Sequence, residues 1–321
     1  MERKLGENNF EYKLRLCLSK LNKEIDLDWC EIASLIGEDV SADHLRKLSY
    51  GYKEYYDYIN STNGVATRIL SISDTHVPYQ LPITTFKEYV GIVDVLQLNG
   101  DILDCQSISK FSKSYRVSMI EEMVQGRQYI IDLIEYIKPK QVFINYGNHE
   151  MRYQAYLSKN LDDDMLQLMP QTALDLICTD GFYHYDKRNK TKTWYEPICK
   201  AVTSCDVVYT EDWKCKIGNT WFVHPSAFST GMMKTAEKAM QYMITQDRSN
   251  WDCLVMAHTH QLGQYPKGNI MLYEQGACCK TSEMNYTDGK LYNPQQQGFI
   301  YICQDIDGNL IKDKTKLINL N

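Results

Sequence analysis

The sequence lacks several features that would place it in a membrane or outside the cell. No apolar run among its 321 residues is long enough to span a bilayer. No secretory n-region and h-region precede the first charged segment, Glu2-Arg3-Lys4. Internal repeats and low-complexity segments are absent as well. We therefore expect a globular protein of the cytoplasm that makes no contact with a membrane.

The eleven cysteines lack the paired spacing of a structural zinc site. Unpaired thiols are typical of the reduced cytosol, in which disulfides are rare. We expect the adjacent Cys278 and Cys279 to pack near a strand end rather than to bond to each other. A chain of this length can hold one catalytic domain and a small accessory module.

What the chain does contain is an ordered series of short clusters rich in aspartate, asparagine and histidine. They are Asp74-Thr75-His76, Gly100-Asp101-Ile102-Leu103-Asp104, Gly147-Asn148-His149-Glu150, His224 and His258-Thr259-His260. Each follows an apolar run that predicts a buried strand, at 68–73, 93–98, 141–145, 221–223 and 255–256. Side chains at strand ends gather at one edge of an open α/β sheet, so the pattern predicts a common site.

In their order, these clusters resemble those of the calcineurin-like metallophosphoesterases, over about residues 67 to 303. That family carries Asp-x-His, Gly-Asp-x-x-Asp, Gly-Asn-His-Asp/Glu, a lone His and Gly-His-x-His. Two positions depart from it: Ala257 replaces a glycine, and Pro225 follows His224 where the family usually has glycine. The resemblance implies an α/β fold, a four-layer sandwich of two mixed sheets flanked by helices. Within it we expect helices over 115–137 and 230–246 and closing strands over 269–272 and 299–303.

The resemblance also implies two divalent metal ions held by seven side chains. One ion would bind Asp74, His76, Asp101 and His260, and the other would bind Asp101, Asn148, His224 and His258. Asp101 would bridge ions about 3.5–4 Å apart, and a hydroxide between them would attack a phosphate ester. Carboxylate and imidazole ligands suit Mn²⁺, our leading expectation, as well as Fe²⁺ and Zn²⁺. The absence of cysteine from the set argues against a structural zinc.

By the same resemblance, His149 stands outside the metal shell and donates a proton to the leaving oxygen. Asp104 would orient its imidazole, as a carboxylate behind a catalytic histidine does. Glu150 is expected to support the ligands. Arg152 is a candidate for phosphate binding, although a surface salt bridge on the first turn of a helix explains it equally well.

The stretch between Glu150 and His224 is longer than a simple crossover needs and predicts an insertion at about 161–200. We expect a helix over 161–177, followed by basic residues interleaved with aromatic ones. They are Lys187, Arg188, Lys190 and Lys192, beside Tyr183, Tyr185, Trp194 and Tyr195. Such a mixture can hold a nucleotide or a single strand by charge and stacking, with Lys187 and Arg188 as candidate substrate contacts. A solvated loop at the domain edge is the alternative.

Residues 1–66 predict a separate helical module. Apolar residues recur at helical spacing in three stretches: Phe10, Leu14, Cys17, Leu18 and Leu21; Trp29, Ile32, Ala33 and Ile36; Leu45, Leu48, Tyr52 and Tyr55. Gly37 fits a helix stop and Ser41 an N-cap, while 60–64 fits a linker. The arrangement resembles a helix-turn-helix unit.

Charge does not settle what this module binds. It carries nine Lys and Arg against twelve Asp and Glu, a net charge of −3, which gives no strong phosphate-binding face. Arg46, Lys47 and Lys53 nevertheless cluster on the third helix. One interpretation is contact with nucleic acid, and the other is docking of a protein partner or a purely packing role.

The sequence therefore predicts a two-metal phosphoesterase, with a nucleic-acid phosphodiesterase or nuclease as the leading interpretation. DNA-repair nucleases of the family carry a capping domain after the last histidine pair, whereas only about sixty residues follow His260 here. A phosphatase acting on phosphoprotein or small nucleotides is the first alternative. A non-catalytic binding platform is the second, and failure to bind metal would be its signature.

Overall fold

The computed structural model describes residues 3, 8–37, 41–61, 64–110, 117–283 and 294–320. The chain divides into two compact units, Met1–Ala66 and Thr67–Asn321. Among the described residues, no helix combines the length and apolar character needed to cross a membrane.

The first unit consists of α1 (Asn9–Leu21), α2 (Trp29–Ile36) and α3 (Ala42–Ser61). Asn8 and Asp28 begin α1 and α2 with capping boxes, and Gly37, with φ of 70°, ends α2. Ser41 Oγ accepts the amide of His44 at 3.3 Å, which confirms the predicted N-cap. The buried core is formed by Tyr12, Leu16, Cys17, Ile32, Ile36 and Leu45.

Two expectations for this unit were wrong. Tyr55, expected on the inner side of the third helix, is 48% exposed. The linker does not begin at Asn60, because α3 continues through Ser61. Residues 62 and 63 of the predicted linker lie outside the described residues.

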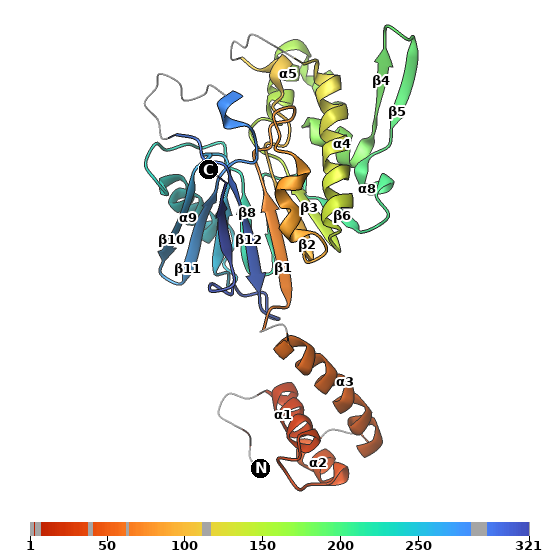
Figure 1. The fold of residues 1–321 in the computed structure, drawn as a ribbon, viewed down its shortest axis with the longest axis vertical. Coiled ribbons are helices and arrows are strands. Elements are labelled where there is room, and N and C mark those ends of the chain that lie inside the picture. The colour runs from red at the N-terminus through yellow and green to blue at the C-terminus, as the bar shows by residue number, and fades with distance from the viewer. Residues whose placement is uncertain are drawn as a thin grey trace. The chain divides into compact units, whose positions relative to one another are not determined.

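The second unit is built on two mixed sheets (Figure 1). The six-stranded sheet has the order β13 (Lys316–Asn319), β12 (Gly298–Gln304), β1 (Thr67–Ile72), β2 (Val95–Asn99), β3 (Gln141–Asn145) and β6 (Asp206–Tyr209). The five-stranded sheet has the order β10 (Leu262–Lys267), β11 (Ile270–Gln275), β9 (Cys253–Met256), β8 (Thr220–Val223) and β7 (Lys214–Ile217). Strands β1, β2, β3 and β6 run parallel, as do β8, β9 and β11.

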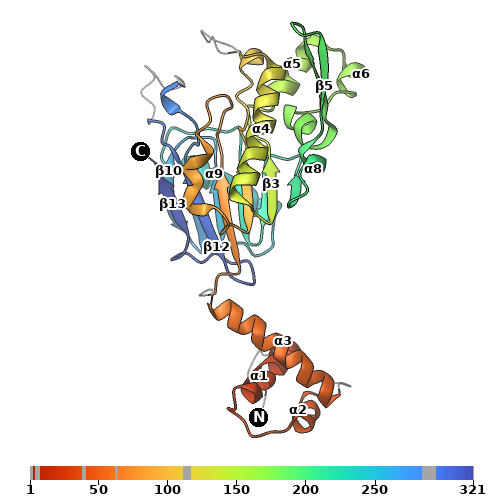
Figure 2. The ribbon, with the colours of Figure 1, turned by 45° about the vertical axis from the view of Figure 1, so that its right-hand side comes forward.

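The sheets pack face to face, and helices cover their outer faces. Side chains of both sheets, including Ile69, Ile300, Phe222 and Val255, form one buried cluster between them. On the far side of the larger sheet lie η1 (Ile83–Tyr89) and α4 (Met119–Ile137) (Figure 2). Helix α9 (Lys234–Gln246) packs on β9 and β11 of the smaller sheet. This is the four-layer sandwich that the sequence predicts.

Two predicted helices begin later than expected. Ser118 caps α4, which starts at Met119 rather than at 115, and positions 115 and 116 lie outside the described residues. Met233 has φ of 58°, a left-handed conformation that keeps residues 230–233 out of α9.

The helix expected over 161–177 is wrong. The segment contains α6 (Asp163–Leu166), α7 (Ala173–Asp175) and the π-helical η3 (Leu176–Asp180), with Pro170 between the first two. Proline lacks the amide that a continuous helix would need at this point. The segment then forms a hairpin of β4 (Phe182–Asp186) and β5 (Thr191–Tyr195), where the alternative interpretation expected a solvated loop. Four short elements complete the unit: η2 (Gln106–Ile108), α5 (Arg152–Asn160), α8 (Ile198–Ala201) and η4 (Thr281–Glu283).

Candidate metal centre

The predicted ligands follow the carboxyl ends of five parallel strands. Asp74 and His76 follow β1, Asp101 follows β2 and Asn148 follows β3; from the other sheet, His224 follows β8, and His258 and His260 follow β9. Because the two sheets pack face to face, their strand ends meet at one edge, and side chains far apart in sequence converge there.

Several ligand residues have a backbone conformation that side chains rarely adopt. The φ angles of Asp74, His76, Asp101 and His260 are 50°, 44°, 49° and 54°. Each turns the chain sharply after its strand. Such conformations cost about 1–3 kcal/mol each and persist where the surroundings hold them for function.

Two glycines allow the three loops after β2, β3 and β8 to approach. At Gly100, with φ of 74°, a Cβ would lie 2.6 Å from Nδ1 of His224 and 2.8 Å from Cα of Gly147. At Gly147, a Cβ would lie 2.5 Å from the amide nitrogen of Asp101. A larger residue at either position would push the ligands apart.

The side chains form two neighbouring groups, one of Asp74, His76 and His260 and one of Asp101, His224 and His258. In the first, Nε2 of His260 lies 3.2 Å from Oδ1 of Asp74 and 3.1 Å from Nε2 of His76. In the second, Nε2 of His224 lies 3.2 Å from Oδ2 of Asp101, beside His258. The same Oδ2 lies 3.9 Å from Nε2 of His76, which places the carboxylate of Asp101 between the two groups.

Two hydrogen bonds and one longer contact behind three imidazoles direct their Nε2 atoms toward the centre. Nδ1 of His224 lies 2.7 Å from the carbonyl oxygen of Asn99, and Nδ1 of His260 lies 3.2 Å from Oε1 of Gln295. Nδ1 of His76 faces Oδ1 of Asp104 at 3.4 Å. Since these oxygens accept, each Nδ1 donates, and Nε2 is the nitrogen left to bind a metal ion.

Buried polar atoms in this cluster fit a pair of divalent cations. Oδ1 of Asp74, Oδ1 of Asn148 and Nε2 of His224 are buried and make no hydrogen bond of normal geometry within the described residues. Burying polar atoms without such bonds costs free energy of folding. The cluster therefore needs a partner that several of these atoms can bind at once, as they would a metal ion. Carboxylate, amide oxygen and imidazole donors are those that first-row divalent ions accept.

The electrostatics of the cluster point the same way. Burial opposes ionisation of Asp74, yet His224 and His260 lower its pKa to about 2. Burial equally disfavours a charge on His224, but Asp101 and Asp74 raise its pKa to about 10. The paired carboxylates thus attract positive charge to this cluster.

A third group stands beside the two ligand sets. Oδ1 of Asp104 lies 3.0 Å from Nδ1 of His149, and Nη2 of Arg152 lies 2.7 Å from Nε2 of the same imidazole. Nη1 of Arg152 also donates to the carbonyl oxygen of Asp104 at 2.7 Å. Arg152 therefore belongs to the site rather than to a surface salt bridge, and its i,i+3 spacing from His149 at a helix start was the available signal.

Two buried glutamates hold the loops that carry these residues. Glu150 accepts the backbone amides of Asp101, Leu103 and Gly147 at 3.0, 2.9 and 2.8 Å. It thereby ties the loop after β2 to the loop after β3. Glu122 of α4 accepts the amides of residues 105 and 106 in the same way. The role of Glu122 was missed, because nothing in its local sequence distinguishes it from an exposed helix residue.

The remaining candidates lie elsewhere. Lys187 and Arg188 occupy the exposed turn of the β4–β5 hairpin, not the buried cluster. Tyr183, Trp194 and Lys192 share one face of that hairpin. The rings of Tyr183 and Trp194 are 4.7 Å apart, and Nζ of Lys192 lies 3.9 Å from the centre of the Tyr183 ring.

Comparisons with known proteins complete the description. Similar solved structures include an archaeal phosphodiesterase, 14% identical, with a TM-score of 0.35 over 79% of this chain and 100% of the other. Vps29 from Entamoeba histolytica complexed with Zn²⁺ is 12% identical, with a TM-score of 0.38 over 79% and 100% of the two chains. No curated protein matches. The family model of calcineurin-like phosphoesterases matches residues 67–262, a span that contains every cluster from Asp74 to His260.

Proposed function

The chain belongs to the calcineurin-like phosphoesterase family, and we propose that, as a metal-dependent hydrolase of phosphate esters, it cleaves the phosphodiester bonds of nucleic acid. Support for the ester chemistry comes from the buried ligand cluster. Support for a nucleic-acid substrate comes from the aromatic and basic face of the β4–β5 hairpin.

Two ions would share the carboxylate of Asp101. Asp74, His76 and His260 would complete one site, and Asn148, His224 and His258 the other. When bound, such a pair supplies Lewis acidity toward the phosphate and lowers the pKa of a water molecule. Mn²⁺ is the leading candidate, supported by oxygen and imidazole donors without a thiolate, which Fe²⁺ and Zn²⁺ also accept.

His149 would protonate the leaving oxygen. Its Nδ1 faces Asp104, which fixes the orientation of the ring and stabilises an imidazolium. Its Nε2 faces the guanidinium of Arg152. A phosphate oxygen that takes over the Arg152 donors would free Nε2 to take up a proton from water. The imidazolium so formed would give that proton to the ester oxygen, so Arg152 would bind substrate and free His149 in the same step.

The observation that carries the choice of nucleic acid is the exposed face of the hairpin. Tyr183, Tyr185 and Trp194 are 55%, 54% and 47% exposed, and Lys192 lies over the Tyr183 ring. Exposed rings beside a cation can stack bases and neutralise phosphates without reading sequence. Lys187 and Arg188, in the turn, would add contacts to the same strand.

A substrate panel with Mn²⁺ tests this proposal. We expect hydrolysis of bis-p-nitrophenyl phosphate and single-stranded DNA, with little release from p-nitrophenyl phosphate. Activity on the monoester alone would favour a phosphatase of phosphoprotein or small nucleotides, and failure to bind metal would favour a binding platform.

Variants of the hairpin test the role of its exposed face. Trp194→Ala should weaken binding of single-stranded DNA by about tenfold, as loss of one stacking contact does, and leave hydrolysis of the small diester unchanged. The matched control is Thr193→Ala, because neighbouring residues of a strand point to opposite faces. Equal DNA affinity in both variants would show that this face of the hairpin does not bind the substrate.

A further inference from the structure

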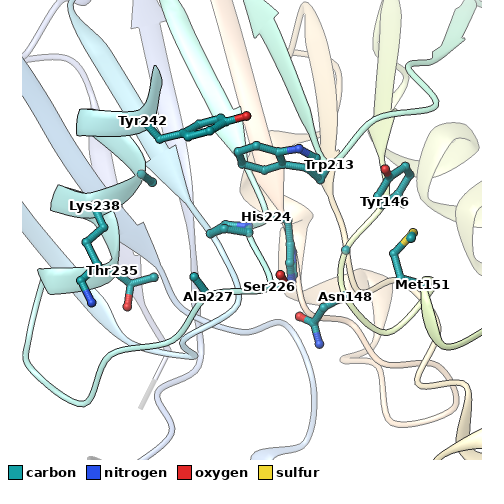
Figure 3. Close-up of a pocket in the computed structure, with 13 residues that line it drawn as sticks. Tyr146, Asn148, Met151, Trp213, His224, Ser226, Ala227, Thr235, Lys238 and Tyr242 are labelled. Atoms are coloured by element: carbon teal, nitrogen blue, oxygen red, sulfur yellow. The ribbon is translucent and has the colours of Figure 1, made fainter. Parts of the chain in front are cut away.

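A pocket of about 370 Å³ opens beside the second ligand group (Figure 3). Two of its lining residues, Asn148 and His224, are proposed metal ligands, and the rest of the wall is largely apolar and aromatic. Its volume lies in the range of about 300–1,000 Å³ that is usual for small-molecule sites. A phosphate held at the metal centre would therefore place one of its ester groups within reach of this pocket.

The wall is formed by side chains from different parts of the second unit. Trp213 precedes β7, Tyr242 lies on α9, and Tyr146 and Met151 come from the segment between β3 and α5. In Figure 3, Trp213 and Tyr242 lie together on one side of His224, while Asn148 and Met151 lie on another. An occupant would meet aromatic surface and, at its other end, the metal ligands.

Trp213 is fixed relative to the ligand His224. The carbonyl oxygen of Trp213 accepts the amide of His224 at 2.8 Å and the side-chain amide of Asn145 at 3.2 Å. The Trp213 and Tyr242 rings are 5.7 Å apart and inclined by 50°, so they form a wedge rather than a closed stack. A planar group can stack on the aromatic surface that the two rings present to the pocket.

We propose that this pocket binds the nucleobase of the nucleotide adjoining the scissile phosphate. The inference rests on the proposed function, because it takes the phosphate position from the metal centre. A nucleobase presents a planar face to the aromatic rings and polar edges to Ser226 and Lys238, which also line the pocket. Its sugar spans the distance between a phosphate at the centre and a ring beside it. A phosphotyrosine ring has neither the spacer nor the polar edges.

Calorimetric titration of the Mn²⁺-loaded protein with two ligands tests the inference. Thymidine 5′-monophosphate carries the base, and deoxyribose 5-phosphate lacks it. Tyr242→Ala should weaken binding of the nucleotide by about tenfold and leave binding of the sugar phosphate unchanged. Tyr242 is 49% exposed, so its loss should not disturb folding. Tyr265→Ala, at a 47% exposed tyrosine outside the pocket, is the matched control and should change neither affinity.

Trp213→Leu provides a second variant and should lower nucleotide affinity in the same selective way. Equal loss for both ligands, or no loss in Tyr242→Ala, would overturn the pocket assignment. The two proposals fail separately. Single-stranded DNA that is not cleaved, together with nucleotide binding that depends on Tyr242, would refute the nuclease activity alone. Cleaved DNA with Tyr242-independent binding would refute the pocket alone.

Discussion

Nη2 of Arg152 lies 2.7 Å from Nε2 of His149. A guanidinium can only donate, so Nε2 accepts this hydrogen bond and a neutral His149 carries its proton on Nδ1, toward Asp104. The imidazole is therefore held from both sides. In the proposed mechanism His149 transfers a proton and binds no metal ion, so the two functions can be tested separately.

The first prediction concerns His149 itself. His149→Gln should lower the turnover number by roughly 10²–10⁴-fold, the usual contribution of a positioned acid or base, while the metal content stays near that of the unchanged protein. Elemental analysis and steady-state kinetics on the same preparation measure both. If His149→Gln lost as much metal as Asp101→Asn, His149 would be a metal ligand rather than the general acid.

Arg152→Ala should lower kcat/KM for a diester by about 10- to 100-fold, because a charge-assisted hydrogen bond contributes about 1.5–3 kcal/mol. Its effect should depend on His149, since residues in contact are not additive. In a double-mutant cycle, Arg152→Ala in the His149→Gln background should cost clearly less than in the unchanged protein. Equal effects in the two backgrounds would show that Arg152 acts on substrate without positioning His149.

A third prediction concerns stability. Glu150→Ala leaves three buried backbone amides without their acceptor, and each such group costs about 1–3 kcal/mol. The free energy of unfolding, measured by denaturant titration, should fall by several kcal/mol. Glu237→Ala, which removes a partly exposed carboxylate paired with Lys234 and Lys267, should change it little. Similar free energies of unfolding for the two variants would show that Glu150 does not stabilise these loops.

The N-terminal unit gives a prediction about nucleic acid. Arg46 and Lys47 both pair with Asp43, at 2.9 and 2.7 Å, and Nζ of Lys53 donates to Asn22 at 3.1 Å. We expect that changing all three basic residues to Ala leaves DNA affinity and its salt dependence nearly unchanged, because few phosphates would be neutralised. Weaker DNA binding with a flatter salt dependence, together with unchanged hydrolysis of a small diester, would instead show that this unit binds DNA for the catalytic unit.

Local patterns predicted part of this molecule well. Strand β3 has the predicted bounds, and the motifs pointed to side chains that the structure brings together at strand ends. The prediction of one helix over 161–177 was wrong because it relied on apolar spacing and neglected Pro170, which lies between the two short helices of this segment. The pocket could not be predicted, since Trp213 and Tyr242 are neighbours only through the packing of α9 on its sheet. Contacts set by tertiary packing leave no local periodic signal.

The central claim is that Asp101 joins two metal sites in one centre, and the number of ions per chain tests it most directly. Elemental analysis and calorimetric titration with Mn²⁺ should find two ions per chain in active protein. Chelation should abolish turnover, and Asp101→Asn should lose metal. A single ion per chain in fully active protein would contradict the shared role of Asp101 and the two-metal account with it.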